Sequence, residues 1–241
     1  MTKHVLLNNI AHKDLKVITD FAAAYGDDVG STLTFPTEYA DVHREYPILF
    51  QKNESTGKFQ SIILLGFKSD ENLFLNSAGG WNANYVPAVV ERGPFLIGFQ
   101  DQSRDGGSER APVVHVDVES PRISSTQGKA VFLEHGGLSP YLEKISQLLN
   151  RIYEGMQVSD AMFAAFTELD LIEPVNLEIA LNDRETYRLN GNYTIHREKL
   201  ANLNGVDLER LNRAGFLRCA FLVVESLGNI QKLITLKGKR G

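Results

Sequence analysis

The sequence predicts an α+β protein, in which an antiparallel or mixed sheet packs against helices. Three observations lead to this prediction. The first half of the 241-residue chain contains short apolar runs separated by polar turns, a pattern typical of paired strands. Residues 175–195 then alternate apolar and polar side chains around a polar turn, which indicates an antiparallel hairpin with one buried face. On either side of this hairpin, apolar residues recur at helical spacing.

The strands of the first half are predicted from its apolar runs. Residues 46–50 and 59–65 are joined by the polar linker 52–57, so they are expected to form a hairpin. The polar, glycine-containing segment Gln100–Arg110 is expected to be a mobile surface loop. Further strands are expected at residues 72–75, 95–99 and 113–118.

The helices of the second half have clear start signals and apolar stripes. Ser139 can cap a helix that has Pro140 at its first position, and an apolar stripe follows as far as Met156. A second helix is expected at about 160–169. A long C-terminal helix is expected at about 207–235, and its apolar run predicts that it is buried. Together these elements predict one integrated domain over residues 1–241.

Composition limits the classes of function. The formal net charge is -5 and the pI is near 5.7, which argues against a nucleic-acid partner. The single cysteine, Cys219, fits a reducing compartment. The N-terminal apolar run Val5–Leu7 is too short for a signal peptide, and the apolar run 216–224 is too short to cross a membrane. We therefore expect a cytoplasmic protein without membrane insertion, whose oligomeric state the sequence leaves open.

The best candidate for a binding site is the segment Gly79–Arg92, which contains the only tryptophan of the chain. Glycine and proline force this backbone into turns, so large aromatic side chains here indicate a shaped loop. The predicted aromatic contacts are Trp81 and Tyr85, and the predicted polar contacts are Asn82, Asn84 and Arg92. A second interpretation is equally open, in which Trp81 is a core plug that closes one end of the sheet.

A metal-dependent oxygenase is the most concrete enzymatic alternative. His115 and Asp117 share one face of a predicted strand, as two ligands of a facial iron triad would. A solvated polar strand face explains the same spacing, and His135 or His196 would have to supply a third ligand. No nucleophile elbow, phosphate-binding loop or other cofactor motif occurs, so no cofactor is predicted. The basic C-terminal residues, Lys232 among them, are expected to complement the helix dipole.

The order and spacing of several segments resemble the SapC family, named from bacterial surface-layer protein operons. The matching segments, which cover nearly the whole chain, are LNNIAHKDL (7–15), YPILF (46–50), LLGF (64–67), NLFLNSAGGWNANYVPAVVERGPF (72–95), DVESPRIS (117–124), ELDLIEP (168–174), LNGNYTIHREKL (189–200) and ESLGN (225–229). Glu91-Arg92-Gly93 stands where the resemblance leads one to expect an Arg-Arg pair, so one positive charge of the candidate loop is missing.

The resemblance implies an accessory role rather than a defined reaction. For the SapC family, gene context suggests a part in surface-layer protein secretion, and some members neighbour outer-membrane receptors and flavin-dependent halogenases. We therefore expect a cytoplasmic accessory or binding protein for surface-protein export or nutrient uptake, whose partner is an unidentified protein or small molecule. The enzymatic alternative with His115 and Asp117 stays open at this point.

Overall fold

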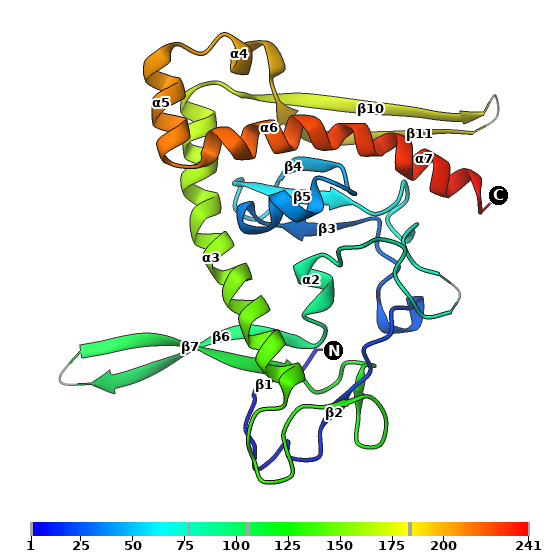
Figure 1. The fold of residues 1–241 in the computed structure, drawn as a ribbon, viewed down its shortest axis with the longest axis vertical. Helices are drawn as coiled ribbons and strands as arrows, with labels where there is room; N and C mark the ends of the chain where they lie inside the picture. The colour runs from blue at the N-terminus through cyan, green and yellow to red at the C-terminus, as the bar shows by residue number, and fades with distance from the viewer. Residues whose placement is uncertain (1, 77, 105–106, 183–184, 241) are drawn as a thin grey trace. The chain divides into compact units, whose positions relative to one another are not determined.

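The chain folds into two compact units that are described here from a computed structural model. The described residues are 2–76, 78–104, 107–182 and 185–240, without the side chains of 101–110 and 182–184. Residues 2–27 and 88–153 form the first unit, and residues 28–87 and 154–240 form the second unit. Antiparallel sheets combined with helices confirm the α+β class (Figure 1). The single integrated domain stays a prediction.

The elements follow one another along the chain with strands concentrated before residue 131 and helices after residue 196. In order they are β1 (His4–Leu6), β2 (Lys16–Val17), η1 (Ala23–Tyr25), β3 (Ser31–Thr34), η2 (Pro36–Glu38), α1 (Tyr39–Val42), β4 (Ile48–Lys52), β5 (Phe59–Leu64), α2 (Ala88–Glu91), β6 (Phe95–Arg104), β7 (Gly107–Asp117), β8 (Ile123–Ser124), β9 (Lys129–Ala130), α3 (Pro140–Glu168), β10 (Ile172–Asn182), β11 (Glu185–Ile195), α4 (Arg197–Ala201), α5 (Gly205–Arg213), α6 (Phe216–Ser226), η3 (Leu227–Asn229) and α7 (Ile230–Gly238).

The first unit contains two small antiparallel sheets, with strand orders β1-β7-β6 and β8-β2-β9. The β6–β7 ladder runs from Phe95 opposite Val116 to Arg104 opposite Gly107. The expected loop at residues 100–110 was therefore wrong for the described positions, which continue the two strands, while residues 105–106 lie outside the description. Phe95 and Val116 are fully buried, and so is the apolar stripe of the first half of α3 at Leu142, Ile145 and Leu149.

Helix α3 begins as the sequence predicts and continues further. The Ser139 hydroxyl accepts a hydrogen bond from the Leu142 N–H at 3.2 Å, as an N-cap should. Two helices were expected, but one continuous helix runs from Pro140 to Glu168. No proline interrupts the polar stretch between the two expected helices, and the Ser159 hydroxyl donates to the Gly155 carbonyl within the helix at 2.8 Å.

The second unit is built on a five-stranded antiparallel sheet with the order β10-β11-β4-β5-β3. Pairing of Tyr193 with Phe50 joins the two predicted hairpins, although the turn residues 183–184 lie outside the description. Phe50 packs edge-on against Phe163 of α3, with ring centroids 5.0 Å apart. The strand expected at residues 72–75 is absent, because this segment forms only an isolated bridge from Leu75 to Trp81.

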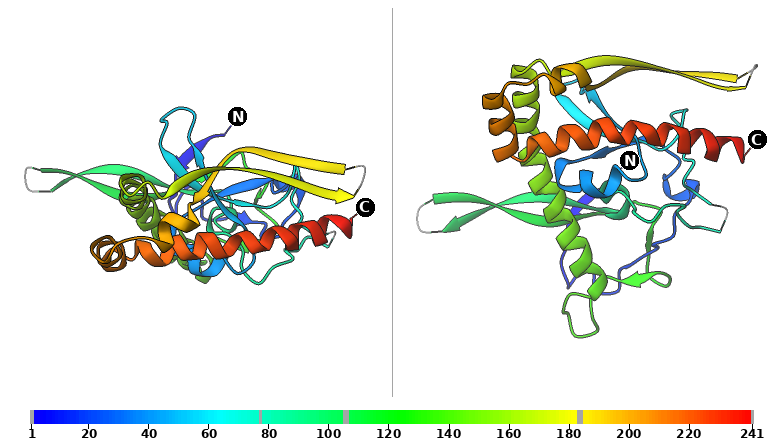
Figure 2. Two further views of the ribbon diagram at one scale, coloured as in Figure 1. Left: turned by 90° about the horizontal axis from the view of Figure 1, so that it is seen from above. Right: turned by 45° about the horizontal axis from the view of Figure 1, so that its top comes forward.

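The C-terminal helical segment lies along the sheet of the second unit, beside β11 (Figures 1 and 2). It begins at Phe216 rather than near residue 207, because Gly215 has a φ of +77° and separates α6 from α5. Burial is one-sided: Ala220, Val223 and Leu233 are inaccessible, whereas Phe221 is 47% exposed. The expectation of a helix buried all round is corrected to a helix with one buried stripe.

Residues 216–238 satisfy the length and composition criterion for a membrane-spanning helix, although the run 216–224 alone is too short. This 23-residue stretch is long and apolar enough to cross a membrane by length and composition, with a mean hydropathy of 1.3 over an 18-residue window within it. Core helices of soluble proteins meet the same criterion, and here Lys232 and Lys237 pair with Glu45 and Glu71 of the second unit. The absence of membrane insertion stays a prediction.

Candidate functional site

The candidate loop begins with a tight turn that places Trp81 against the core of the second unit. The Asn76 side-chain oxygen accepts hydrogen bonds from the N–H groups of Ala78 and Gly80 at 3.0 and 2.9 Å. This turn brings Trp81 opposite Leu75 as an isolated bridge. The indole then stacks on the buried Phe74 ring, with centroids 6.0 Å apart and an interplanar angle of 12°. One face of the Trp81 indole is therefore packed against the Phe74 ring.

A chain of hydrogen bonds fixes the polar ends of both loop aromatics. The Trp81 indole N–H donates to the Tyr46 hydroxyl at 2.7 Å, and that hydroxyl donates to the Tyr85 carbonyl at 2.5 Å. The Tyr85 hydroxyl in turn donates to Glu38 Oε2 at 2.8 Å. Burial raises the pKa of Tyr46, so this hydroxyl stays protonated as a donor. The polar ends of Trp81 and Tyr85 therefore point inward and fix their orientations.

Glu45 holds the backbone of the same loop. Its Oε1 accepts from the N–H groups of Asn84 and Tyr85 at 2.8 and 3.1 Å, and its Oε2 pairs with Lys232 Nζ at 2.8 Å. Burial alone would raise the pKa of Glu45, but the hydrogen bond and charge of Lys232, with the two N–H donors, lower it overall. Lys232 therefore binds the carboxylate that anchors the loop; it lies in the first turn of α7, whose last turn carries Lys237.

The structure brings four of the five predicted contact residues together. The Asn82 and Asn84 side chains are exposed, while Trp81 and Tyr85 are partly buried. Arg92 lies in the first unit, after α2, and its guanidinium donates to the Phe95 carbonyl at 2.5 Å. Burial lowers the pKa of Arg92. The loop surface thus consists of two exposed amides beside two aromatics that are anchored from within.

The residues that anchor this loop were missed by sequence reasoning. Glu38, Glu45 and Tyr46 carry no catalytic or ligand-binding spacing, and Lys232 is far away in the sequence. One available signal was Tyr46, which opens the matched segment YPILF although an interior strand needs no hydroxyl. Buried hydroxyls require hydrogen-bond partners, so such a tyrosine indicates a polar network nearby.

His115 and Asp117 lie on β7, where their side chains have structural contacts. The Asp117 carboxylate accepts from the N–H groups of Lys3 and Glu119 at 2.9 and 3.2 Å. The His115 ring lies over Gly98, where a Cβ atom would come within 2.5 Å of Nε2. Within the described residues, no three His, Cys, Asp or Glu side chains gather as metal ligands would. No third ligand for the oxygenase alternative is found there.

Arg122, in the matched segment DVESPRIS, is a buried cation of the first unit with several hydrogen bonds. It is 5% exposed, and its Nη2 lies 2.7 and 2.5 Å from the two carboxylate oxygens of Asp27. Its Nη1 donates to the carbonyls of Ile18 and Asp20 at 3.1 and 2.6 Å, and its guanidinium lies 5.0 Å from the Tyr25 ring centroid. This arrangement encloses the charge and serves the fold.

Comparison with known proteins identifies the family without assigning a reaction. The SapC family profile matches residues 7–233 of the 241-residue chain. No curated protein and no solved structure matches the chain. The matched range includes Asn76 and the turn residues 78–80, the anchored loop and both of its anchoring acids. The chain therefore belongs to the SapC family.

Proposed function

We propose that this protein is a non-enzymatic accessory protein that binds a protein partner through the loop at residues 81–85. The observation that carries the proposal is the inward anchoring of Trp81 and Tyr85 beside the exposed side chains of Asn82 and Asn84. Aromatics fixed before binding lose little conformational entropy on association, and amides supply adaptable hydrogen bonds. The loop thus combines preorganised apolar contacts with polar ones.

The cellular role is proposed from the family. SapC gene context supports a cytoplasmic accessory protein that acts in surface-layer protein export or in outer-membrane nutrient uptake. A protein partner suits this role better than a small molecule, because the loop offers aromatic and amide side chains on a surface, as protein-binding patches do. Arg92 is excluded from the proposed contact surface, since its guanidinium is bonded within the first unit.

The test compares partner capture by variants with unchanged folds. Tagged wild-type protein, the Asn82→Ala/Asn84→Ala variant and the control Asn212→Ala are expressed in the native cell, and bound proteins are quantified by mass spectrometry. Asn212 is an exposed amide on α5, outside the loop. We expect a specific partner with wild type and control and its loss by about tenfold or more with the double variant. Equal capture by all three proteins would contradict the proposal.

A small-molecule role for the same loop gives a different result. In that case no protein would be enriched by wild type over the double variant, while native mass spectrometry of wild type purified under mild conditions would show a bound mass that the double variant lacks. This result would overturn the protein-partner proposal and keep the loop as a site.

A further inference from the structure

A cleft in the second unit is the basis of an inference that is independent of the loop at residues 81–85. It has a volume of about 450 Å³ and lies against the five-stranded sheet, where β3, β4, β5 and β11 and the segment 66–69 contribute to its walls. This volume is in the usual range for small-molecule sites. Its polar lining side chains include those of Ser31, Gln51, Lys68, Arg188, Asn190 and Asn192.

Strand β11 supplies two amide groups and a cation to the cleft, at an irregular part of its ladder. Arg188, Asn190 and Asn192 all line the cleft, and a register shift lies between the pairs of Leu189 and Asn192, where Gly191 has a φ of +77°. Asn192 is only 4% exposed, and its side-chain oxygen accepts from Gln51 Nε2 on β4 at 3.0 Å. This hydrogen bond between a buried and a partly buried amide on neighbouring strands fixes part of the cleft floor.

The wall that carries Lys68 is fixed by close backbone contact. The Gly30 N–H donates to the Ser69 carbonyl at 2.9 Å, and a Cβ atom at residue 30 would lie 2.0 Å from the Lys68 carbonyl oxygen. Only glycine permits this approach. The Lys68 ammonium is exposed and lies 5.7 Å from the Tyr187 ring centroid, so its position is partly fixed by a cation–π contact.

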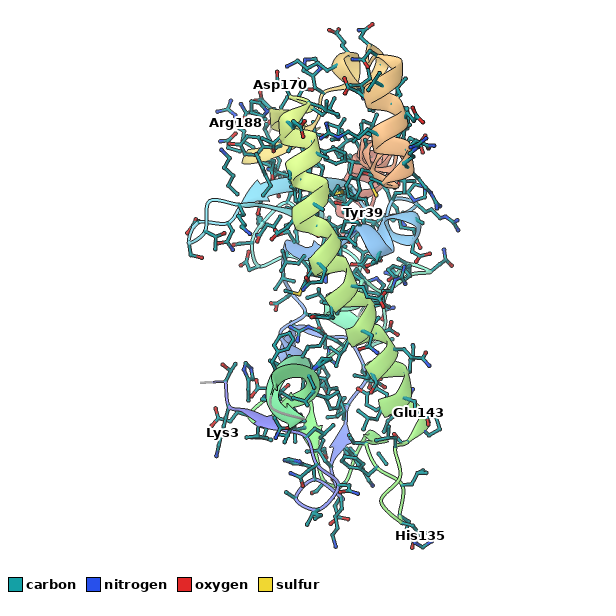
Figure 3. All side chains as sticks on the ribbon, turned by 90° about the vertical axis from the view of Figure 1, so that its left-hand side faces the viewer. Lys3, Tyr39, His135, Glu143, Asp170 and Arg188 are labelled. Carbon is teal, nitrogen blue, oxygen red and sulfur yellow. The ribbon has the colours of Figure 1, made fainter. Side chains whose placement is uncertain are left out.

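The charge of the lining is opposite to that of the protein. The chain has a formal net charge of -5, yet no acidic residue is among the described residues that line this cleft, and two cations are. Arg188 lies at the surface (Figure 3) and shares its charge with Glu178 on β10, at 3.0 Å. Lys68 is therefore the main cation available to a ligand, with amides and a hydroxyl around it.

We infer that this cleft binds a small hydrophilic anion, with a carboxylate or phosphate group placed at Lys68 and hydroxyl groups on the amides of Gln51, Asn190 and Asn192. A cation pairs with the anionic group by a charge-assisted hydrogen bond. Side-chain amides both donate and accept, as ligand hydroxyl groups require. The lining also contains the apolar side chains of Val29, Leu64, Phe67 and Leu189, against which the carbon skeleton of such a ligand can pack.

Three sugars with the same ring test the chemistry: glucose 6-phosphate, glucuronate and neutral glucose. Titration calorimetry and ¹H–¹⁵N chemical shifts are measured for each sugar with the full chain at low salt. We expect the phosphate or the carboxylate sugar to bind with shifts at residues 66–69 and 188–192, and glucose to bind at least about tenfold more weakly. The comparison of the two anionic sugars identifies the preferred anion.

Variants locate the site within the chain. Lys68→Gln removes the main cation, and Asn190→Asp adds a negative charge at an exposed position of the cleft, so each is expected to weaken binding by about tenfold or more. Lys58→Gln, which removes an exposed lysine outside the cleft, is the matched control and should bind as wild type does. The melting temperature of each variant is measured to check that all three fold.

Three results would overturn the inference. The first is that neither anionic sugar binds at concentrations on the order of 10 mM. The second is that glucose binds as tightly as both anionic sugars. The third is that Lys68→Gln and Asn190→Asp bind as tightly as Lys58→Gln. None of these results bears on the loop at residues 81–85, whose partner binding is measured separately.

Discussion

The buried polar anchors of the two units differ in what they leave at the surface. In the first unit, Arg122 and Asp27 form one enclosed ion pair, with side-chain exposures of 6% and 8%. In the second unit, Glu38, Glu45 and Tyr46 hold a loop whose outer amides are exposed. Buried polar groups in one chain can therefore serve stability alone, or they can also fix a surface for recognition.

The enclosed pair of the first unit should give the largest effect on stability. Arg122→Met removes the guanidinium from a buried carboxylate, so we expect a loss of about 3–5 kcal/mol in the free energy of unfolding. Urea denaturation measures this loss in the free energy of unfolding. The double variant Arg122→Met/Asp27→Leu should recover much of this loss, because no buried charge remains.

The exposed pair of Lys144 and Glu91 is the matched comparison for this prediction. Their side chains are 64% and 27% exposed, so Lys144→Met should cost less than about 1 kcal/mol. If Arg122→Met proved as mild as Lys144→Met, the enclosed pair would not be the anchor of the first unit.

Removal of the indole in the second unit should have the next largest effect. Trp81→Ala loses the stacking on Phe74 and the hydrogen bond to Tyr46, but the ring is only partly buried. We expect a cost of about 2–3 kcal/mol, below that of a fully buried tryptophan. A cost near 5 kcal/mol by chemical denaturation would favour the core-plug interpretation instead.

The hydroxyl chain makes a smaller, coupled contribution. Tyr46→Phe and Trp81→Phe both remove the hydrogen bond from the indole to the hydroxyl, and Tyr46→Phe also removes the one from the hydroxyl to the Tyr85 carbonyl; each should cost about 1–2 kcal/mol. Because they break the same bond, the double variant should lose less than the sum of the two single losses. Strictly additive losses in a double-mutant cycle would show that this bond does not hold the loop.

The pH dependence of the second unit should report on Glu45. Its pKa is lowered in the folded state, so its contribution to stability is present above the unfolded value of about 4.3 and is lost as pH falls through the folded value. Glu45→Gln should therefore reduce stability at neutral pH and flatten the decline below about pH 4.3. Unfolding measured by denaturant across this range tests the sign, and an unchanged decline would contradict it.

The exposed amides should give the smallest stability effect and the largest effect on binding. Asn82→Ala/Asn84→Ala should change the free energy of unfolding by less than about 0.5 kcal/mol, because both side chains are exposed. A larger loss in thermal or chemical denaturation would assign the amides to the scaffold.

Much of the fold could be predicted because its signals are local. Ser139 and Pro140 mark the start of α3, alternation indicates the hairpin at 175–195, and two apolar runs around a polar linker indicate the hairpin at 46–65. The continuation of β6 and β7 beyond residue 100 could not be predicted, since the sequence there is polar and contains glycine, which is typical of a loop. The break at Gly215 was also missed, because the apolar pattern continues past it while the φ of +77° does not.

The candidate site was only partly predictable. The aromatics and amides of the loop could be found from their composition, because such side chains are unusual on a backbone rich in glycine. The residues that anchor the loop could not be predicted, because Lys232 and Glu45 lie 187 positions apart and a single sequence gives no signal for that contact. The predicted contact Arg92 belongs to the first unit and the other four to the second, since the boundary falls between Pro87 and Ala88, which proximity in sequence does not indicate.

Quenching of Trp81 fluorescence tests the central claim most directly, because it is the only tryptophan. Acrylamide quenching is measured on the free protein and on the complex purified from the native cell, with any tryptophan of the partner replaced by phenylalanine. We predict that acrylamide quenches Trp81 partially in the free protein and clearly less in the complex. Emission that is fully shielded in the free protein and unchanged in the complex would show that Trp81 belongs to the core and that the loop is not the binding surface.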